Sequence, residues 1–290
     1  SMLGHVLDTA RALNPDRISV VYGHGGDQVR AVLDAPDVSW VEQAEQLGTG
    51  HAVRQALPGL GDGEVLILYG DVPLITPQTL RELTARVSEN SVALLTTVVP
   101  DPTGYGRIVR DDAANVSAIV EQRDASPAEL SIDEINTGLM ALRAVDLERW
   151  VRALDTNNAQ AEYYLTDIIA MAVGEGVAIA TTRADDPDEV TGVNDRLQLA
   201  ALERAFQARQ VRHLMAHGVT FRDPERVDIR GTVTAGEDVT IDVNVVLEGH
   251  VDLADGVSIG PNNLIRDARI DADVSILANC VIEEAAVGAN

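Results

Sequence analysis

Short apolar runs alternate with helix-like patterns through the first two thirds of the chain. The runs typical of strands cover residues 18–22, 39–42, 64–68, 91–99, 106–110 and 116–121. Helical patterns lie between several of them, over residues 27–33, 50–57 and 77–87. Strands that alternate with helices form βαβ units, in which the strands run parallel. The pattern therefore predicts an α/β fold with a mostly parallel sheet.

The pattern changes near residue 195. Asp195 to His217 reads as one helix, because Leu199, Leu202 and Phe206 share a face and Gly218 follows the last turn. We expect this helix and the residues after it, 195–228, to connect two domains.

A six-residue repeat begins at Ile229. Its aliphatic positions are Ile229, Ala235, Ile241, Leu247, Leu253, Ile259 and Ile265, followed after a five-residue step by Ile270, then Ile276 and Ile282, and after another short step Val287. This period is typical of a hexapeptide β-helix, whose coils have three such strands each. A β-meander is the alternative, but it would need hairpin turns between its strands. The predicted domains are residues 1–194, a connector over 195–228, and a β-helix over 229–290.

Composition narrows the class of protein. The 290 residues are 46% hydrophobic and 23% charged, so the chain can bury a large core and form two domains. The net charge of −24 disfavours binding to nucleic acid or an anionic membrane. No apolar run is long enough to span a bilayer, and the N-terminal residues lack a signal-peptide pattern. With Cys280 as the single cysteine, these features predict a cytoplasmic protein without internal disulfides.

The stretch "ILYGDVPLI" places Asp71 between two apolar runs. Residues 64–68 are expected to form a fully buried central strand. Asp71 then follows the carboxyl end of that strand, the edge at which ligands bind in open α/β sheets. A carboxylate there can hold a metal, or it can belong to an ordinary turn before Pro73.

Four further stretches place small or polar residues where loops are expected. In "QAEQLGTGHA", Gly48 and Gly50 allow close backbone approach, and Thr49 can cap the helix that follows. "DPTGYGR", "VEQRDA" and "EINTGLM" contribute Gly106, Glu121 and Asn136. Each motif alone is weak.

Taken in order, these motifs resemble one family. With "NNAQAEYYLTDII", "GVNDRLQLA" and the hexapeptide repeats, they are similar to the bacterial bifunctional N-acetylglucosamine-1-phosphate uridylyltransferases/glucosamine-1-phosphate acetyltransferases. The resemblance implies a Rossmann-like nucleotidyltransferase domain joined to a left-handed β-helix, through which three chains assemble. It also implies that UTP and N-acetylglucosamine 1-phosphate are converted to UDP-N-acetylglucosamine and pyrophosphate.

The resemblance also implies roles for individual residues. Asp71 and Asn194 correspond to Mg²⁺ ligands. Gln43, Gly48 and Thr49 would hold the uracil. The expected lining of the nucleotide-sugar pocket is Tyr69, Gly70, Gly106, Glu121 and Asn136. The sugar phosphate attacks the α-phosphorus of UTP directly, so no protein nucleophile is expected.

Two parts of the family pattern are not found in this sequence. A strand and glycine-rich loop that grip the triphosphate are expected before Ser1, and the residues for acetyl transfer from acetyl-CoA are expected after Asn290. We therefore expect weak binding of UDP-N-acetylglucosamine without turnover, and either a trimer that dissociates on dilution or a monomer. Two alternatives stay open: another sugar-1-phosphate nucleotidylyltransferase, such as a guanylyl or adenylyl enzyme, and a non-catalytic binding or scaffold fragment.

Overall fold

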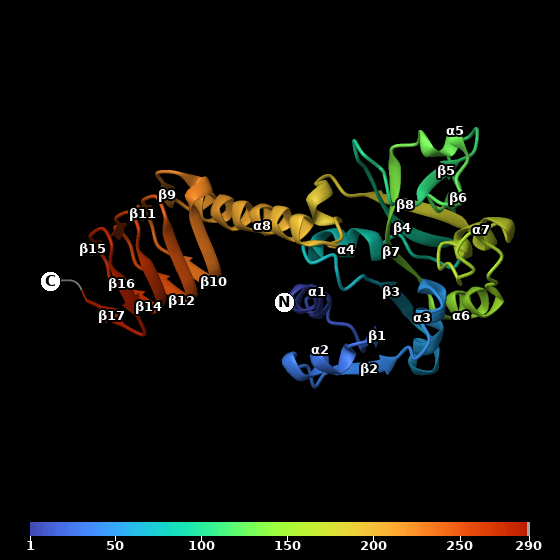
Figure 1. Cartoon of the computed structure of the whole chain (residues 1–290), viewed down its shortest axis with the longest axis horizontal. Helices are drawn as coiled ribbons and strands as arrows, with labels where there is room; N and C mark the ends of the chain where they lie inside the picture. The colour runs from blue at the N-terminus through green and yellow to red at the C-terminus, as the bar shows by residue number, and fades with distance from the viewer. Residues whose placement is uncertain (289–290) are drawn as a thin grey trace. The chain divides into compact units, whose positions relative to one another are not determined.

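The structure, a computed structural model, describes residues 1–288. The chain divides into two compact units, Ser1–Asn194 and Asp195–Asn290, and each has hydrophobic clusters of its own. Figure 1 labels the elements of both. The last two residues of the predicted repeat domain, 289 and 290, lie outside the described part.

The first unit contains two sheets. Strands β1 (Ile18–Tyr22) and β2 (Val38–Glu42) form a parallel pair. The larger sheet has the order β6-β5-β7-β4-β8, with β3 also paired to β7. Its strands are β3 (Glu64–Ile67), β4 (Ser91–Val98), β5 (Arg107–Arg110), β6 (Val116–Val120), β7 (Glu134–Arg143) and β8 (Ala178–Arg183).

Strand β7 divides one of its edges between two partners. Arg107 of β5 pairs with Ile135 near the start of β7, and β3 pairs with residues 140–143 near its end. All three of its neighbours, β3, β4 and β5, run antiparallel to β7. The backbone of residues 136–139 consequently lies between the ends of β5 and β3, where the loops that follow or precede these strands can meet.

The α/β class is confirmed, but strand direction in the larger sheet differs from the expected parallel arrangement. In the described residues of that sheet only the β4–β8 pairing is parallel, whereas the pairings around β7 and the β5–β6 pair are antiparallel. The β1–β2 pair and the sheets of the second unit are parallel. The prediction that 64–68 is fully buried was wrong: Glu64 is exposed and the rest of β3 is only half-buried. Its only pairing partner in the described residues is β7, so one edge receives no cover from a neighbouring strand.

Helices cover both faces of the larger sheet (Figure 1). The helices of the first unit are α1 (Met2–Arg11), α2 (Gly26–Val32), α3 (Thr49–Ala56), α4 (Pro77–Thr84), α5 (Pro127–Leu130), α6 (Ala144–Ala153) and α7 (Asp167–Gly174). Leu94 of β4 packs in a cluster with Trp150 of α6 and Ile168 of α7. Its neighbour Leu95 packs with Leu80 of α4 on the opposite face. Because both faces of β4 are covered, its apolar residues are continuous rather than alternating.

The second unit begins with the long helix α8 (Arg196–Ala216). The side chain of Asp195 caps it, because its Oδ1 accepts the N–H groups of Leu197 and Gln198, each at 2.8 Å. At the other end Gly218 has φ 97°, and the Val219 N–H donates to the Leu214 carbonyl at 3.1 Å. Glycine adopts this left-handed conformation without strain, so the helix ends where the sequence predicts.

The rest of the second unit forms two sheets, and the strands of each sheet run parallel. One has the order β10 (Val227–Ala235), β12 (Val245–Leu253), β14 (Leu264–Ile270) and β16 (Val281–Glu283), with β17 (Ala286–Val287) on β14. The other has β9 (Thr220–Phe221), β11 (Thr240–Ile241), β13 (Ser258–Ile259) and β15 (Ser275–Ile276).

The register of these strands follows the six-residue repeat. Ile229 lies beside Leu247 and Leu247 beside Ile265, each 18 residues further on. The offset falls to 17 at Leu253 and Ile270, after a register shift between Glu248 and Val251. The coil with the five-residue step is therefore one residue shorter, and the pairing adjusts at the register shift between Glu248 and Val251.

Among residues 1–288, no helix combines the length and the apolar character that crossing a membrane requires.

Candidate functional site

The turn after β3 holds Asp71 against a distant segment. The Val72 N–H donates to the Tyr69 carbonyl at 3.2 Å, and the Val193 N–H donates to the Asp71 carbonyl at 3.0 Å. A Cβ on Gly192 would lie 3.6 Å from Asp71 Oδ2. The residues leading to Asn194 thus run alongside Asp71. Within residues 1–288 there is no cluster of three or more His, Cys, Asp or Glu side chains suited to a metal.

Gln43 is buried at the end of β2 beside the glycine turn. Its Nε2 donates to the Gly48 carbonyl at 3.2 Å and lies 3.0 Å from His51 Nδ1. Gly48 has φ 107°, and a Cβ there would come within 2.7 Å of the Tyr163 carbonyl oxygen. Only glycine fits this close approach, which packs the turn onto the segment after α6.

The predicted capping role of Thr49 was wrong. Gly48 is the residue before α3, and no side chain caps that helix. Thr49 Oγ1 instead accepts the N–H of Leu165 at 3.1 Å, and the Gly50 N–H donates to the Tyr163 carbonyl at 2.8 Å. These bonds tie residues 48–50 to residues 163–165. Thr49 is already the first residue of α3, one position beyond the place from which a side chain caps a helix.

Tyr69 lies between the charged residues of the site. Its ring covers Gly138, where φ is 82° and an added Cβ would lie 2.5 Å from the ring. Burial raises the pKa of the Tyr69 hydroxyl to about 12, and the charges of Glu121 and Asp71 add to this, while a hydrogen bond with Thr49 opposes it. Gly70, next to it, packs near Leu3, 3.3 Å from an added Cβ.

Gly106, Glu121 and Asn136 meet at the gap along β7. The Asn136 N–H donates to the Gly106 carbonyl at 2.9 Å. A Cβ on Gly106 would lie 3.4 Å from each carboxylate oxygen of Glu121. Asn136 Oδ1 accepts the Gly138 N–H at 3.0 Å. The structure therefore brings together these three predicted residues. Of the three, Glu121 also acts on the pKa of Tyr69, as Asp71 and Thr49 do.

The surroundings of Glu121 shift the pKa of its carboxyl group. Burial raises its pKa, the nearby carboxylates of Asp167 and Asp124 raise it further, and a hydrogen bond from Thr166 Oγ1 at 3.0 Å lowers it. The net upward shift of the pKa means that burial destabilises the charged carboxylate. A ligand hydroxyl or amide N–H that donates a hydrogen bond to Glu121 would replace the water that burial removes.

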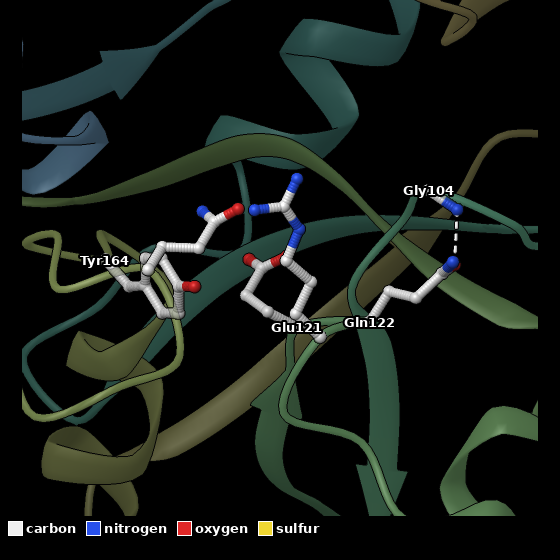
Figure 2. A pocket seen from close by; sticks show the side chains of 6 residues that line it. Gly104, Glu121, Gln122 and Tyr164 are labelled. Atoms are coloured by element: carbon white, nitrogen blue, oxygen red, sulfur yellow. Dashed lines mark hydrogen bonds between the residues drawn. The ribbon is translucent and has the colours of Figure 1, made fainter.

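A cavity of about 370 Å³ opens beside Glu121 (Figure 2). Its lining residues are Gly104, Glu121, Gln122, Arg123, Gln160 and Tyr164. Of these, the sequence analysis predicted only Glu121. Gln160 and Tyr164, and Thr166 behind them, belong to the motif "NNAQAEYYLTDII", so the motif was the available signal, but its sequence does not show which side chains face inward.

Two comparisons define the class of protein. Residues 1–128 match the family model of the MobA-like NTP transferase domain. A solved structure described as a glucose-1-phosphate thymidylyltransferase from Bacillus anthracis superposes with a TM-score of 0.53 at 18% identity, covering 69% of this chain and 80% of the other. The first unit therefore has a nucleotidyltransferase fold.

Curated relatives narrow this class to one family. The bifunctional protein GlmU of Pseudomonas entomophila (strain L48) is 57% identical over 99% of this chain. The GlmU of Marinobacter nauticus is 53% identical over 100% of it. The chain spans 63% and 64% of the length of these two relatives. The chain is thus similar to bifunctional GlmU proteins over nearly its whole length.

Proposed function

We propose that the first unit is a uridylyltransferase, which transfers uridylyl from UTP to N-acetylglucosamine 1-phosphate and releases pyrophosphate. The observation that carries this proposal is the hydrogen bond from Val193 N–H to the Asp71 carbonyl, which aligns the two segments expected to hold the metal. The names of the relatives and the nucleotidyltransferase fold support the same class of reaction.

Asp71 and Asn194 fit a magnesium ion. Mg²⁺ prefers oxygen ligands, keeps several waters and is commonly held by one or two protein groups together with substrate phosphates. One carboxylate and one amide oxygen on adjacent segments meet that need without a larger acidic cluster. When bound, the ion would offset the negative charges of the two phosphorylated substrates, which matters in a protein of net charge −24.

The remaining residues would bind and orient the substrates. Gln43, Gly48 and Thr49 would contact the uracil, because their amide, backbone and hydroxyl groups line the turn before α3. Tyr69, Gly70, Gly106, Glu121 and Asn136 would surround the sugar. The phosphate oxygen of the sugar is itself the nucleophile, so positioning for in-line attack is the main task of these side chains.

We also infer that the second unit is the beginning of a left-handed β-helix through which three chains associate. The 18-residue register and the buried aliphatic positions support a coil of three six-residue strands. In the longer relatives, whose name states two functions, the extended domain would carry acetyl transfer from acetyl-CoA to glucosamine 1-phosphate.

A panel of nucleotide sugars tests the uridylyltransferase proposal. Isothermal titration in the presence of Mg²⁺ should show binding of UDP-N-acetylglucosamine and at least about tenfold weaker binding of GDP-mannose and ADP-glucose. Tighter binding of either purine compound would identify a different nucleotidylyltransferase. Absence of binding for all three would favour a scaffold function.

The same titration with variants tests the uracil site. Gln43→Ala should weaken every uridine compound, because it removes a buried amide that the turn holds in place. Gln78→Ala is the matched control, since Gln78 is a surface glutamine whose Nε2 bonds Glu82 at 2.7 Å. Equal affinities in the two variants would remove Gln43 from the site.

A further inference from the structure

One amide side chain joins the two segments that wall the cavity. Gln122 Oε1 accepts the N–H of Gly104, the bond drawn in Figure 2, and lies 3.4 Å from Arg107 Nη2. Gly104 has φ 91°, a left-handed conformation. The other hydrogen bonds of its turn are local: the Tyr105 N–H donates to the Pro102 carbonyl at 3.2 Å and the Thr103 N–H to Asp101 Oδ1 at 3.1 Å. Gln122 therefore holds the loop before β5 against the residues that follow β6.

Arg107 supports Gln122 from inside the protein. Only 2% of its surface is exposed, and its Nη1 donates to the Tyr105 carbonyl. Its hydrogen-bond partners are neutral groups, and among residues 1–288 its buried Nε has no hydrogen-bond partner, while the Asp101 carboxylate interacts with the guanidinium electrostatically. A buried cation with neutral partners costs more free energy than an apolar side chain of the same size. Stability alone does not account for an arginine at this position.

The loop that this pair holds carries a predicted sugar contact. Gly106 lies between Gly104 and Arg107 in the chain, faces the Glu121 carboxylate, and accepts the Asn136 N–H. A shift of the Gly104 turn would consequently move the backbone of Gly106 relative to both side chains. Catalytic and binding geometry is sensitive to displacements of about 1 Å.

We propose that Gln122, supported by Arg107, is a positioning residue that sets the shape of the sugar pocket. It acts on the ligand through the Gly104 loop and through the spacing of Gly106, Glu121 and Asn136. This inference rests on the proposed function, because it assigns the cavity to the sugar of a nucleotide sugar. The nucleotide itself is held elsewhere, at the turn before α3.

Comparing UDP with UDP-N-acetylglucosamine isolates the sugar's share of binding. In isothermal titrations with Mg²⁺, the ratio of the two affinities measures what the sugar adds. Gln122→Ala should reduce that ratio about tenfold and leave the affinity for UDP unchanged. Arg107→Lys should reduce it less, because an ammonium keeps the charge but cannot reach both the Tyr105 carbonyl and Gln122. Gln78→Ala should change neither affinity.

The outcomes separate this inference from the proposed function. If the unmodified chain binds neither compound, the proposed function is wrong. If it binds both and Gln122→Ala keeps the ratio, or lowers both affinities equally, the positioning role is wrong. If the unmodified chain binds UDP as tightly as the nucleotide sugar, the cavity does not hold the sugar. Circular dichroism checks that each variant folds. If Arg107→Lys does not fold, the Gln122→Ala variant alone tests the positioning role, because Gln122 is only half-buried.

Discussion

The two units of this protein place their polar groups in different ways. In the second unit, equivalent positions of successive coils make equivalent contacts: the Asn244 side chain donates to Asn262 Oδ1, and Asn262 donates to Asn279 Oδ1. In the first unit, each site residue has a different partner from a different segment. Thr49 bonds Leu165, Thr166 bonds Glu121, and Val193 bonds Asp71.

This difference predicts which substitutions change stability and which change ligand binding. A repeated contact is specified locally, and its free energy is spread over coils that resemble one another. A site assembled from distant segments brings like charges and buried polar groups together, as Tyr69 shows through the combined effects of burial, Glu121 and Asp71 on its pKa. Substitutions should therefore have their largest effects on binding in the first unit and on unfolding in the second.

The largest effect is expected at the metal site. Asp71→Ala should abolish the Mg²⁺ dependence of nucleotide-sugar binding by this chain. In the chain extended to the length of its relatives, it should lower pyrophosphate release by on the order of 100-fold or more, because the metal's charge stabilisation is worth several kcal/mol. Thermal unfolding should change little.

Asp62→Ala is the control for that experiment, because it removes the same charge from an exposed loop residue. Near-normal turnover of the Asp71 variant at saturating Mg²⁺ would show that this carboxylate belongs to an ordinary turn.

The sequence predicted most of the strands because their apolar runs are local signals. The runs at residues 18–22 and 91–99 correspond to β1 and β4, and the repeat from Ile229 predicted the buried positions of the second unit. Strand β7 was missed. Its central residues Asn136 and Thr137 are polar, and they are buried only because long-range partners, such as the Leu95 carbonyl for Thr137 Oγ1, satisfy them.

The candidate site was less accessible to sequence reasoning. Position at a strand end indicated Asp71, but the pairing with Asn194 came from the resemblance to a family, because nothing local joins the two segments. Tyr164 and Gln122 were missed for the same reason. Their inward position depends on how the segments after α6 and β6 pack against each other, which composition and periodicity do not contain.

The second largest effect is expected in the repeat. Leu247→Ala should lower the free energy of unfolding of the second unit by about 2–5 kcal/mol, because Leu247 is fully buried and neighbouring coils cannot collapse into the cavity. Denaturant unfolding measures this. Leu277→Ala, at a residue that is 76% exposed, should change it by less than about 0.5 kcal/mol. A matching loss of UDP affinity in the Leu247 variant would contradict the separation of the two units.

A smaller effect is expected from the charge of Glu121. Burial raises the pKa of this carboxyl above its usual value, so its contribution to stability is present at low pH and is lost as the pH rises through that raised pKa. Glu121→Gln stays neutral and should be more stable than the unmodified protein at pH 7, while binding the nucleotide sugar less tightly. The difference in melting temperature should disappear near pH 4.

Glu134→Gln provides the opposite case. The hydrogen bond from Arg110 lowers the pKa of Glu134, and the two side chains form an ion pair at 2.7 Å. Its stabilising contribution is present at neutral pH and is lost as the pH falls through the lowered pKa. This variant should therefore melt below the unmodified protein at pH 7. If both variants shift the melting temperature in the same direction, the two pKa shifts have not been attributed correctly.

The smallest effect is expected in the asparagine ladder. Asn262 has φ 59°, so Asn262→Ala removes the ladder bonds and also forces a β-carbon into the left-handed region. That conformation costs a non-glycine residue about 1–2 kcal/mol, although asparagine tolerates it better than alanine. Asn262→Gly removes the same bonds without this strain. Denaturant unfolding of the second unit should therefore show a smaller loss for glycine than for alanine.

The difference between these two variants isolates the backbone requirement from the side-chain bonds. The side chain of Asn262 is exposed, so the ladder bonds compete with water and should contribute no more than about 1 kcal/mol. Equal losses for glycine and alanine would mean that the bonds, rather than the left-handed corner, keep asparagine at this position. In that case the corner would depend on contacts between coils, and the second unit would resemble the first more closely than its regular register suggests.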